Sequence, residues 1–215
     1  MRRALIVAAC GLAATGPAHA QRLSGQATVS YAEHRVDAGT GLGLEVSKGP
    51  LVTVAGTYAL LPRLTVGVAA TGGNLQPDGT GEERDVAQLA FTARVPITGG
   101  IAAAGSVASR TYTAPIARQA WTIVQLGLEG RMRFGAHRLT GVGRLAYLPV
   151  VSVNGLDNPD LAIAAAAGVE YHGGSLTWGL EYWLERSDFG TQTVGPRLEQ
   201  LTGLALRVSV AVGRK

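Results

Sequence analysis

The stretch that decides the fold runs Val124-Gln125-Leu126-Gly127-Leu128-Glu129-Gly130-Arg131-Met132-Arg133-Phe134. Large apolar residues occupy all of the even positions except Gly130, and charged or amide side chains occupy most of the odd ones. Because successive side chains of a β-strand point to opposite faces, this alternation predicts a strand with one apolar and one polar face.

Segments with the same alternation recur, and ten are counted. They lie near residues 25–35, 50–60, 63–73, 85–96, 100–110, 119–134, 138–151, 161–172, 175–186 and 197–212. An even count puts both chain ends on one side of a sheet. Eight or twelve strands are the alternatives if a marginal segment is misjudged.

The connectors between these segments alternate in length. Short turns are expected at 61–62, 97–99, 136–137 and 173–174, and longer polar loops at 36–49, 74–84, 111–118, 152–160 and 187–196. No stretch after residue 20 has the roughly 18 consecutive apolar residues of a membrane helix, so a membrane would have to be crossed by strands.

Taken together, residues 21–215 resemble the general class of small bacterial outer-membrane β-barrel proteins. The resemblance implies an all-β, antiparallel, up-and-down transmembrane barrel in the cell outer membrane, with short periplasmic turns and longer external loops. It also implies outer-membrane lipids, lipopolysaccharide and the barrel assembly machinery as partners. The chain departs from the class at its end, Val208 to Lys215, which lacks the terminal aromatic residue common there.

Residues 1–20 are predicted to be a secretory signal peptide. Two arginines precede the apolar run Ala4 to Ala14, and Ala18-His19-Ala20 provides the small residues for cleavage before Gln21. A lipoprotein-like box before Cys10 is the alternative, but it would leave too short an apolar region. Since Cys10 is the only cysteine, the mature chain would have no thiol, which excludes disulfides and thiolate sites.

The two faces of the predicted strands differ in the way a barrel in lipid requires. On the apolar outer face, six aromatic residues near the strand ends resemble two interfacial girdles: Tyr31, Tyr58, Phe134, Tyr147, Tyr171 and Trp178. The inner face is expected to carry a charge network that fills the lumen, made of Arg94, Glu129, Arg131, Arg133, Arg144, Glu170, Glu181, Glu185, Glu199 and Arg207.

Two hairpins give register predictions. A two-residue loop at Ala136-His137 would place Glu129 across from Arg144 as an ion pair. A loop at Gly173-Gly174 would place Ala164 across from the inward Trp183.

Little in the sequence indicates catalysis. Glu170 and His172 share the inner face near Ser175, a set that a membrane hydrolase could use, although a polar lumen wall near the periplasmic mouth is the favoured interpretation. The acidic segment Asp78 to Asp85 is expected to be a solvated loop. No cofactor or metal site is predicted, because no motif indicates one. Nucleic-acid binding is not predicted either, because the formal charge falls from +4 to about +2 once Arg2 and Arg3 are removed.

The sequence therefore favours a non-enzymatic outer-membrane barrel with a structural or loop-mediated interaction role and at most a narrow pore. The alternatives are a barrel hydrolase acting on lipid or peptide, and a soluble periplasmic barrel with an apolar ligand inside.

Overall fold

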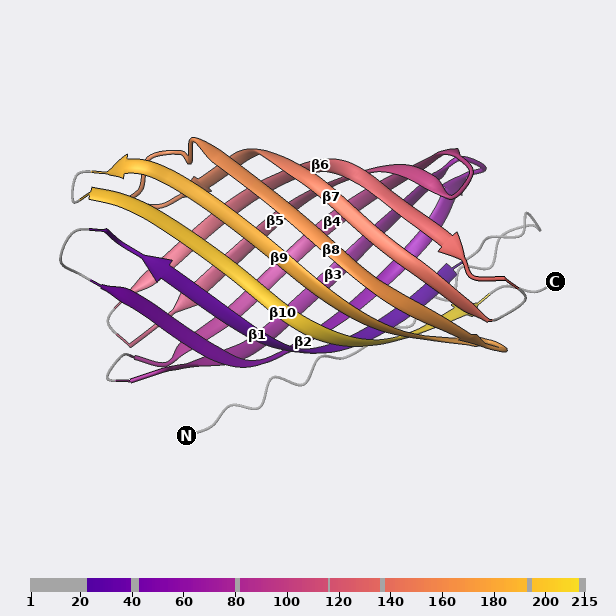
Figure 1. Ribbon diagram of the computed structural model, residues 1–215, viewed down its shortest axis with the longest axis horizontal. Coiled ribbons are helices and arrows are strands. Elements are labelled where there is room, and N and C mark those ends of the chain that lie inside the picture. The colour runs from indigo at the N-terminus through magenta and orange to yellow at the C-terminus, as the bar shows by residue number, and fades with distance from the viewer. Residues whose placement is uncertain are drawn as a thin grey trace.

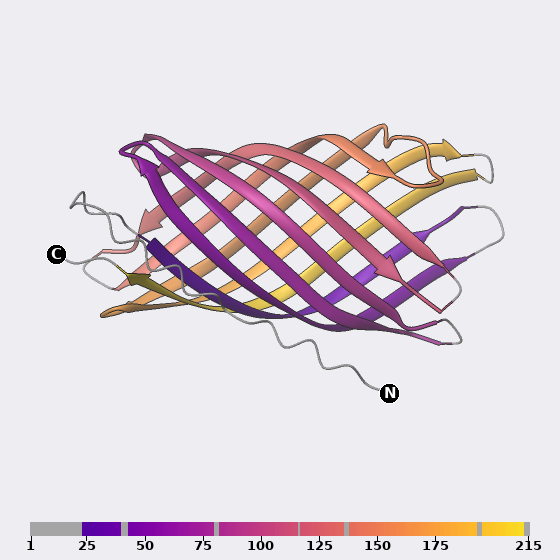
Figure 2. The same ribbon diagram turned by 180° about the vertical axis from the view of Figure 1, so that it is seen from behind.

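The computed structural model describes residues 23–39, 43–79, 82–115, 117–135, 138–192 and 195–212. They form a closed barrel of ten antiparallel strands (Figures 1 and 2). The strands are β1 (Leu23–Asp37), β2 (Leu44–Leu61), β3 (Leu64–Pro77), β4 (Arg84–Thr98), β5 (Ile101–Thr113), β6 (Arg118–Arg133), β7 (Leu139–Val153), β8 (Leu161–Gly173), β9 (Leu176–Gln192) and β10 (Gly195–Val212). The strand number and the up-and-down order predicted from the sequence are confirmed.

Each strand pairs with its neighbours in sequence, and β1 pairs with β10 to close the barrel, from Leu23 opposite Val212 to Asp37 opposite Leu198. One end, the turn end, carries the connectors 62–63, 99–100, 134–138 and 174–175. The opposite end, the loop end, carries 38–43, 78–83, 114–117, 154–160 and 193–194. The first strand therefore begins at the turn end, and the last strand ends there (Figure 1).

The strands reach further toward the loop end than the alternation predicts. β2 already begins at Leu44 and β9 continues to Gln192, within segments that were expected to be loops. A strand outside lipid needs no apolar outer face, so the sequence signal fades before the strand does. Both β2 and β10 contain 18 residues, whereas about 9–11 suffice to cross a tilted path through a bilayer.

Three of the predicted short turns are displaced, since the turn between β2 and β3 is 62–63 instead of 61–62, and the turn between β4 and β5 is 99–100 instead of 97–99. The turn between β8 and β9 is Gly174-Ser175, and Gly173 still pairs with Leu176. Gly174 has a φ of 72°, which glycine adopts without strain. As a result Ala166, instead of Ala164, lies across from Trp183.

The β6–β7 hairpin has the expected register, with Glu129 opposite Arg144. Its predicted turn residues Ala136 and His137 lie outside the described residues, as does the predicted signal peptide with Cys10.

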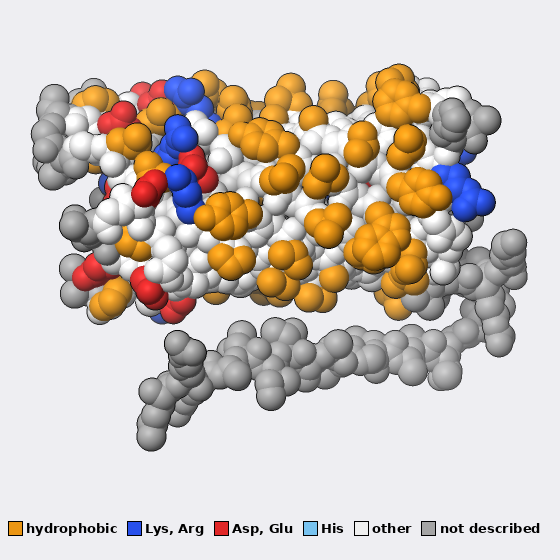
Figure 3. Space-filling model, turned by 60° about the horizontal axis from the view of Figure 1, so that its bottom comes forward, with side chains coloured by type: hydrophobic (Ala, Val, Ile, Leu, Met, Phe, Trp, Pro, Cys, Tyr) orange, Lys and Arg blue, Asp and Glu red, His pale blue; other side chains and the backbone are white. Residues whose placement is uncertain are grey.

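Figure 3 shows a broad apolar band on one face of the outer surface, and exposed large apolar side chains on every strand continue it around the barrel. Large side chains such as Val54, Phe91, Leu126, Leu145 and Leu206 are exposed there. This orientation suits a barrel whose wall meets lipid, and it is opposite to the one that a soluble barrel with an apolar interior needs.

The two faces of the strands exchange character toward the loop end. On β6 the outward residues change from Leu128 and Leu126 to Thr122 and Arg118, while the inward ones change from Glu129 to Ile123 and Trp121. The same exchange occurs on β1, where outward Val29 and Tyr31 give way to Glu33 and Arg35 as Ala32 and Val36 become buried inside. The barrel is thus apolar outside and polar inside along one part, and polar outside and apolar inside along the other.

Among the residues that the structure describes, no helix is long and apolar enough to cross a membrane.

Candidate functional site in the barrel lumen

The lumen near the loop end is filled by a plug of packed apolar side chains. At least one of its members comes from each of the ten strands. They are Ala32, Leu51, Leu75, Val86, Ala90, Ala108, Tyr112, Trp121, Ile123, Leu148, Val151, Val153, Ala162, Phe189 and Leu201. Because every wall of the barrel contributes to one buried cluster, the lumen is occupied at this level across its whole section.

Four ring systems cross the plug in sequence. His34 of β1 stacks on Tyr112 of β5 with ring centroids 4.7 Å apart, Tyr112 contacts the edge of Trp121 at 6.2 Å, and Trp121 contacts Phe189 at 5.8 Å. In the circular strand order β1 and β6 lie on opposite walls, so these contacts span the lumen. Edge-to-face and stacked aromatic pairs of this kind add to the stability gained by burial.

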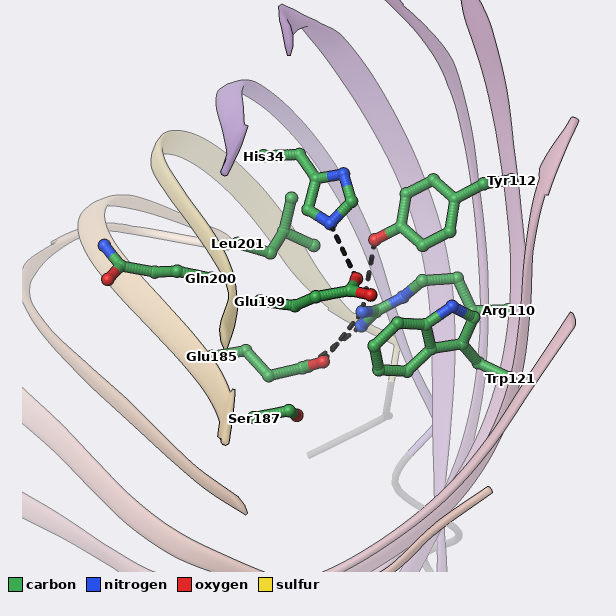
Figure 4. Close-up of a pocket in the computed structure, with 9 residues that line it drawn as sticks. All are labelled: His34, Arg110, Tyr112, Trp121, Glu185, Ser187, Glu199, Gln200 and Leu201. Carbon is green, nitrogen blue, oxygen red and sulfur yellow. Dashed lines mark hydrogen bonds and ion pairs between the residues drawn. The ribbon is translucent and has the colours of Figure 1, made fainter. Parts of the chain in front are cut away.

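A buried ion pair lies within the plug (Figure 4). Arg110 donates from both terminal nitrogens to the Glu185 carboxylate, at 2.7 and 2.9 Å, and from Nε to Gln88 at 2.6 Å. Its Nη1 also reaches the Tyr112 hydroxyl at 3.4 Å. The pair joins β5 to β9 across the lumen, and its two-pronged geometry fixes how these walls face each other.

Glu199 is the second buried carboxylate of the plug. It accepts from Arg197 Nε at 2.7 Å and lies 3.2 Å from His34 Nε2. His34 and Glu199 are both about 2% exposed. A cavity of about 10 Å³ lies among His34, Trp121 and these carboxylates, roughly the room that one water molecule needs.

Three buried polar atoms of the described residues have no hydrogen-bond partner: His34 Nδ1, Ser47 Oγ and Trp121 Nε1. Ser47 lies directly opposite His34 in the β1–β2 register. Serine, histidine and glutamate therefore follow one another on β2, β1 and β10, in the order of a nucleophile, a base and an orienting carboxylate. Alternation alone did not indicate this set, because Ser47 and His34 fell in or beside a segment predicted to be a loop.

Between the plug and the turn end the lumen forms a polar vestibule. A chain of ion pairs runs along its wall from β6 to β10: Arg131 to Glu170 at 3.0 Å, Glu170 to Arg207 at 2.6 Å, Arg207 to Glu181 at 3.8 Å and Glu181 to Arg144 at 3.7 Å. The side chains of Arg131 and Arg144 are 47% and 45% exposed, so the vestibule is open to water.

The charged residues predicted for the lumen divide between these two regions. Glu185 and Glu199 belong to the plug, and the others face the vestibule. Glu129 does not pair with Arg144 as predicted but accepts from Arg94 Nε at 2.8 Å. Arg94 reaches it over β5, where Ala102 and Ala104 leave room.

The expected salt-bridged lumen therefore describes only part of the interior. The plug is mainly apolar, and its members Leu75, Tyr112, Val153 and Phe189 lie in segments that were predicted to be loops. In those polar segments the apolar residues stand singly, so they do not give the repeated alternation by which a strand is identified.

The candidate catalytic pair is not assembled. Both Glu170 oxygens are held by guanidinium groups, of Arg131 and Arg207. His172 has a threonine on each ring nitrogen, Thr140 and Thr177, each at 3.1 Å. Ser175 lies in the exposed turn.

The six predicted girdle residues all lie on the outer surface. Tyr31, Phe134, Tyr147, Tyr171 and Trp178 are between 42% and 61% exposed, and Tyr58 is half-buried. In the acidic segment, Asp78 pairs with Lys48 at 3.0 Å and Asp85 accepts from Asn74 at 3.1 Å.

Comparisons with known proteins bear on the fold. No family model and no curated protein matches the chain. Among solved structures, the outer membrane protease OmpT from Escherichia coli is similar with a TM-score of 0.55 at 11% identity, over 90% of this chain and 97% of that one. The translocator domain of the autotransporter NalP from Neisseria meningitidis gives 0.46 at 11% identity, over 90% and 89%. Neisserial surface protein A gives 0.41 at 12% identity, over 87% and 96%. The chain has the fold of bacterial outer-membrane β-barrel proteins.

Proposed function

We propose that the protein is a non-enzymatic outer-membrane barrel whose lumen is sealed at the cell surface. The loop end faces the exterior and the turn end the periplasm, as is usual in barrels of this kind. The observation that carries the proposal is the plug, to which all ten strands contribute buried side chains. A barrel sealed in this way functions through contacts of its outer wall and its external surface, and does not conduct solutes.

The exchange of faces supports this placement. Where the outer wall is apolar, the surrounding lipid stabilises it. Where the outer wall is polar, it faces water, and the strands then need an apolar interior to bury. The level at which the faces exchange corresponds to the outer surface of the membrane.

Outer-membrane lipids and lipopolysaccharide are the partners that this surface favours. Just beyond the apolar band, the basic residues Arg35, Lys48 and Arg186 face outward on β1, β2 and β9, with Gln200 of β10 between the two arginines. Figure 3 shows basic and acidic groups side by side next to the band, and Arg35 and Lys48 both pair with Glu33. The hydrogen bond from Lys48 to Asp78 raises the pKa of Lys48, which keeps it cationic. Such groups attract the anionic headgroups of a leaflet.

Planar-bilayer conductance tests the seal. The native barrel is expected to give no stable current steps, whereas the variant Tyr112→Ala/Trp121→Ala/Phe189→Ala is expected to conduct because it removes the aromatic side chains that span the plug. Trp178→Ala, which removes a lipid-facing aromatic, serves as the matched control and should stay silent. Each preparation is first checked for the closed barrel by its gel mobility with and without boiling. Steps of equal size in the native and triple-substituted proteins would overturn the proposed seal.

A second candidate is a surface hydrolase acting on lipid or peptide, favoured by the order Ser47, His34, Glu199. These side chains are almost fully buried, so substrate access would require the loop end to open. A fluorophosphonate probe that labels the native protein but not Ser47→Ala would establish this candidate; absence of labelling in intact outer membranes would dismiss it.

A further inference from the structure

The charges of the vestibule do not balance. Among the described residues, five arginines and three glutamates face it: Arg94, Arg131, Arg133, Arg144 and Arg207, with Glu129, Glu170 and Glu181. Two positive charges are therefore in excess. The remaining wall, on β1 to β3, is neutral and carries hydroxyl groups that bond to each other, as in the pairs Ser24 with Thr57 and Thr53 with Thr71.

This excess lies in a space with restricted access to counter-ions. The outer wall at this level is the apolar band, and the plug closes the loop end. A cleft of one sign with low-dielectric walls concentrates ions of the opposite sign, because the field lines run along the water-filled space. Anions can approach only through the turn end.

Two arginines on neighbouring strands have donors to spare. Arg144 Nη2 lies 3.7 Å from Oε1 of Glu181, which is longer than a hydrogen bond. Arg131 donates to Glu170 from Nη1 at 3.0 Å. Since Glu129 lies opposite Arg144, Arg131 is two residues along β6 from that position, which makes the two arginines diagonal neighbours on the inner face.

We propose that the vestibule binds a small oxyanion, with a phosphate group held by Arg131 and Arg144. The planar guanidinium fork matches the oxygens of a phosphate, and two forks side by side supply several charge-assisted hydrogen bonds. Entry from the periplasm rests on the proposed orientation, whereas binding itself does not.

Phosphate binding is measured on the full-length mature barrel in uncharged detergent micelles, by ³¹P line broadening of inorganic phosphate at constant ionic strength against chloride. The native protein is expected to bind, and Arg144→Gln is expected to weaken binding about tenfold, because one charged hydrogen-bond donor is lost. Glu181→Gln is expected to strengthen it, because the positive excess grows. Arg118→Gln, which removes an arginine from the outer face, is the matched control and should leave binding unchanged.

The opposite effects of Arg144→Gln and Glu181→Gln on phosphate binding distinguish a binding site from a structural network. If these residues only stabilised the barrel wall, both substitutions would destabilise it and neither would strengthen binding. Glycerol phosphate, run beside inorganic phosphate, shows whether the site takes the free ion or a phosphorylated molecule. The native protein also gives a location without any variant: phosphate should protect Arg131 and Arg144 from an arginine-directed glyoxal reagent, as read by peptide mass.

Absence of broadening in the native protein would overturn the inference, as would equal binding by the native protein and Arg131→Gln/Arg144→Gln. A conducting native barrel that still binds phosphate would overturn only the seal. The failures of the two proposals are thereby distinguishable.

Discussion

At the scale of single residues, the buried ion pair of Arg110 and Glu185 is sensitive to the loss of either partner. Both side chains are nearly excluded from water, at 7% and 10% exposure, and each is the main partner of the other. Two charges removed from water are tolerated only while they face each other, so removing one leaves the other uncompensated.

Glu185→Ala is therefore expected to lower the free energy of unfolding by about 3–5 kcal/mol. The double variant Arg110→Met/Glu185→Leu, which replaces the pair by apolar groups of similar size, should recover most of that loss. Denaturant unfolding of the barrel in lipid vesicles measures both. A loss below about 1 kcal/mol in the single variant would mean that water reaches Arg110.

At the scale of the strand, a single strand faces lipid along one part of its length and water along another. β6 presents Leu126 to the surroundings at one level and Ala120 at another, and both side chains are exposed on the same outer face. What differs is the medium beside them, since Leu126 lies in the apolar band and Ala120 lies beyond it, next to Arg118.

The same substitution at these two positions should therefore have unequal effects. Leu126→Arg is expected to destabilise the barrel in vesicles by about 2–4 kcal/mol, and Ala120→Arg by about 0–1 kcal/mol. In detergent, where the apolar layer adapts, the difference should shrink. Equal losses at both positions would place the membrane surface elsewhere on β6.

At the scale of the whole molecule, the two ends differ in their connectors and in what lies beneath them. The plug lies under the loop end, and the vestibule opens at the turn end. If the loop end is external, the sealed side meets the environment and the open side meets the periplasm.

Single cysteines test this orientation, because the mature chain is expected to have none. Glu83→Cys, in the connector between β3 and β4, should react with a membrane-impermeant maleimide in intact cells. Ser175→Cys, in the turn between β8 and β9, should react only after the outer membrane is permeabilised. The native protein should remain unlabelled if the predicted cleavage before Gln21 removes Cys10. The reverse labelling pattern would invert the orientation and expose the vestibule to the exterior.

Strand number, strand order and the β6–β7 register could be predicted because, within the apolar band, each strand repeats one rule: large apolar residues outside and small or polar residues inside. Leu126 and Glu129 obey it on β6, and the Glu129–Arg144 register followed directly. The β8–β9 register failed because two adjacent glycines fit either turn, and only the backbone decides that Gly174 takes the positive φ.

The plug could not be predicted from the same rule because it lies where the rule is reversed. Phe189 and Leu75 are inward residues of strands whose outer face is already polar, and isolated apolar residues in polar segments resemble loops. The partner of Glu129 in the ion-pair network could not be predicted from the sequence either. Arg94 and Glu129 are 35 residues apart and lie on strands separated by β5, so their contact depends on the curvature of the closed wall.

The composition of the plug has a consequence for how the barrel forms. Because every strand contributes, no sheet fragment can bury these side chains, and Ala32 of β1 meets Leu201 of β10 in the plug only after the seam between first and last strands has shut. Seam closure and dehydration of the interior are then a single cooperative event. A barrel that has not yet closed would expose an apolar inner surface to the periplasm. Exposed patches of this kind are what chaperones and proteases recognise in incompletely folded chains.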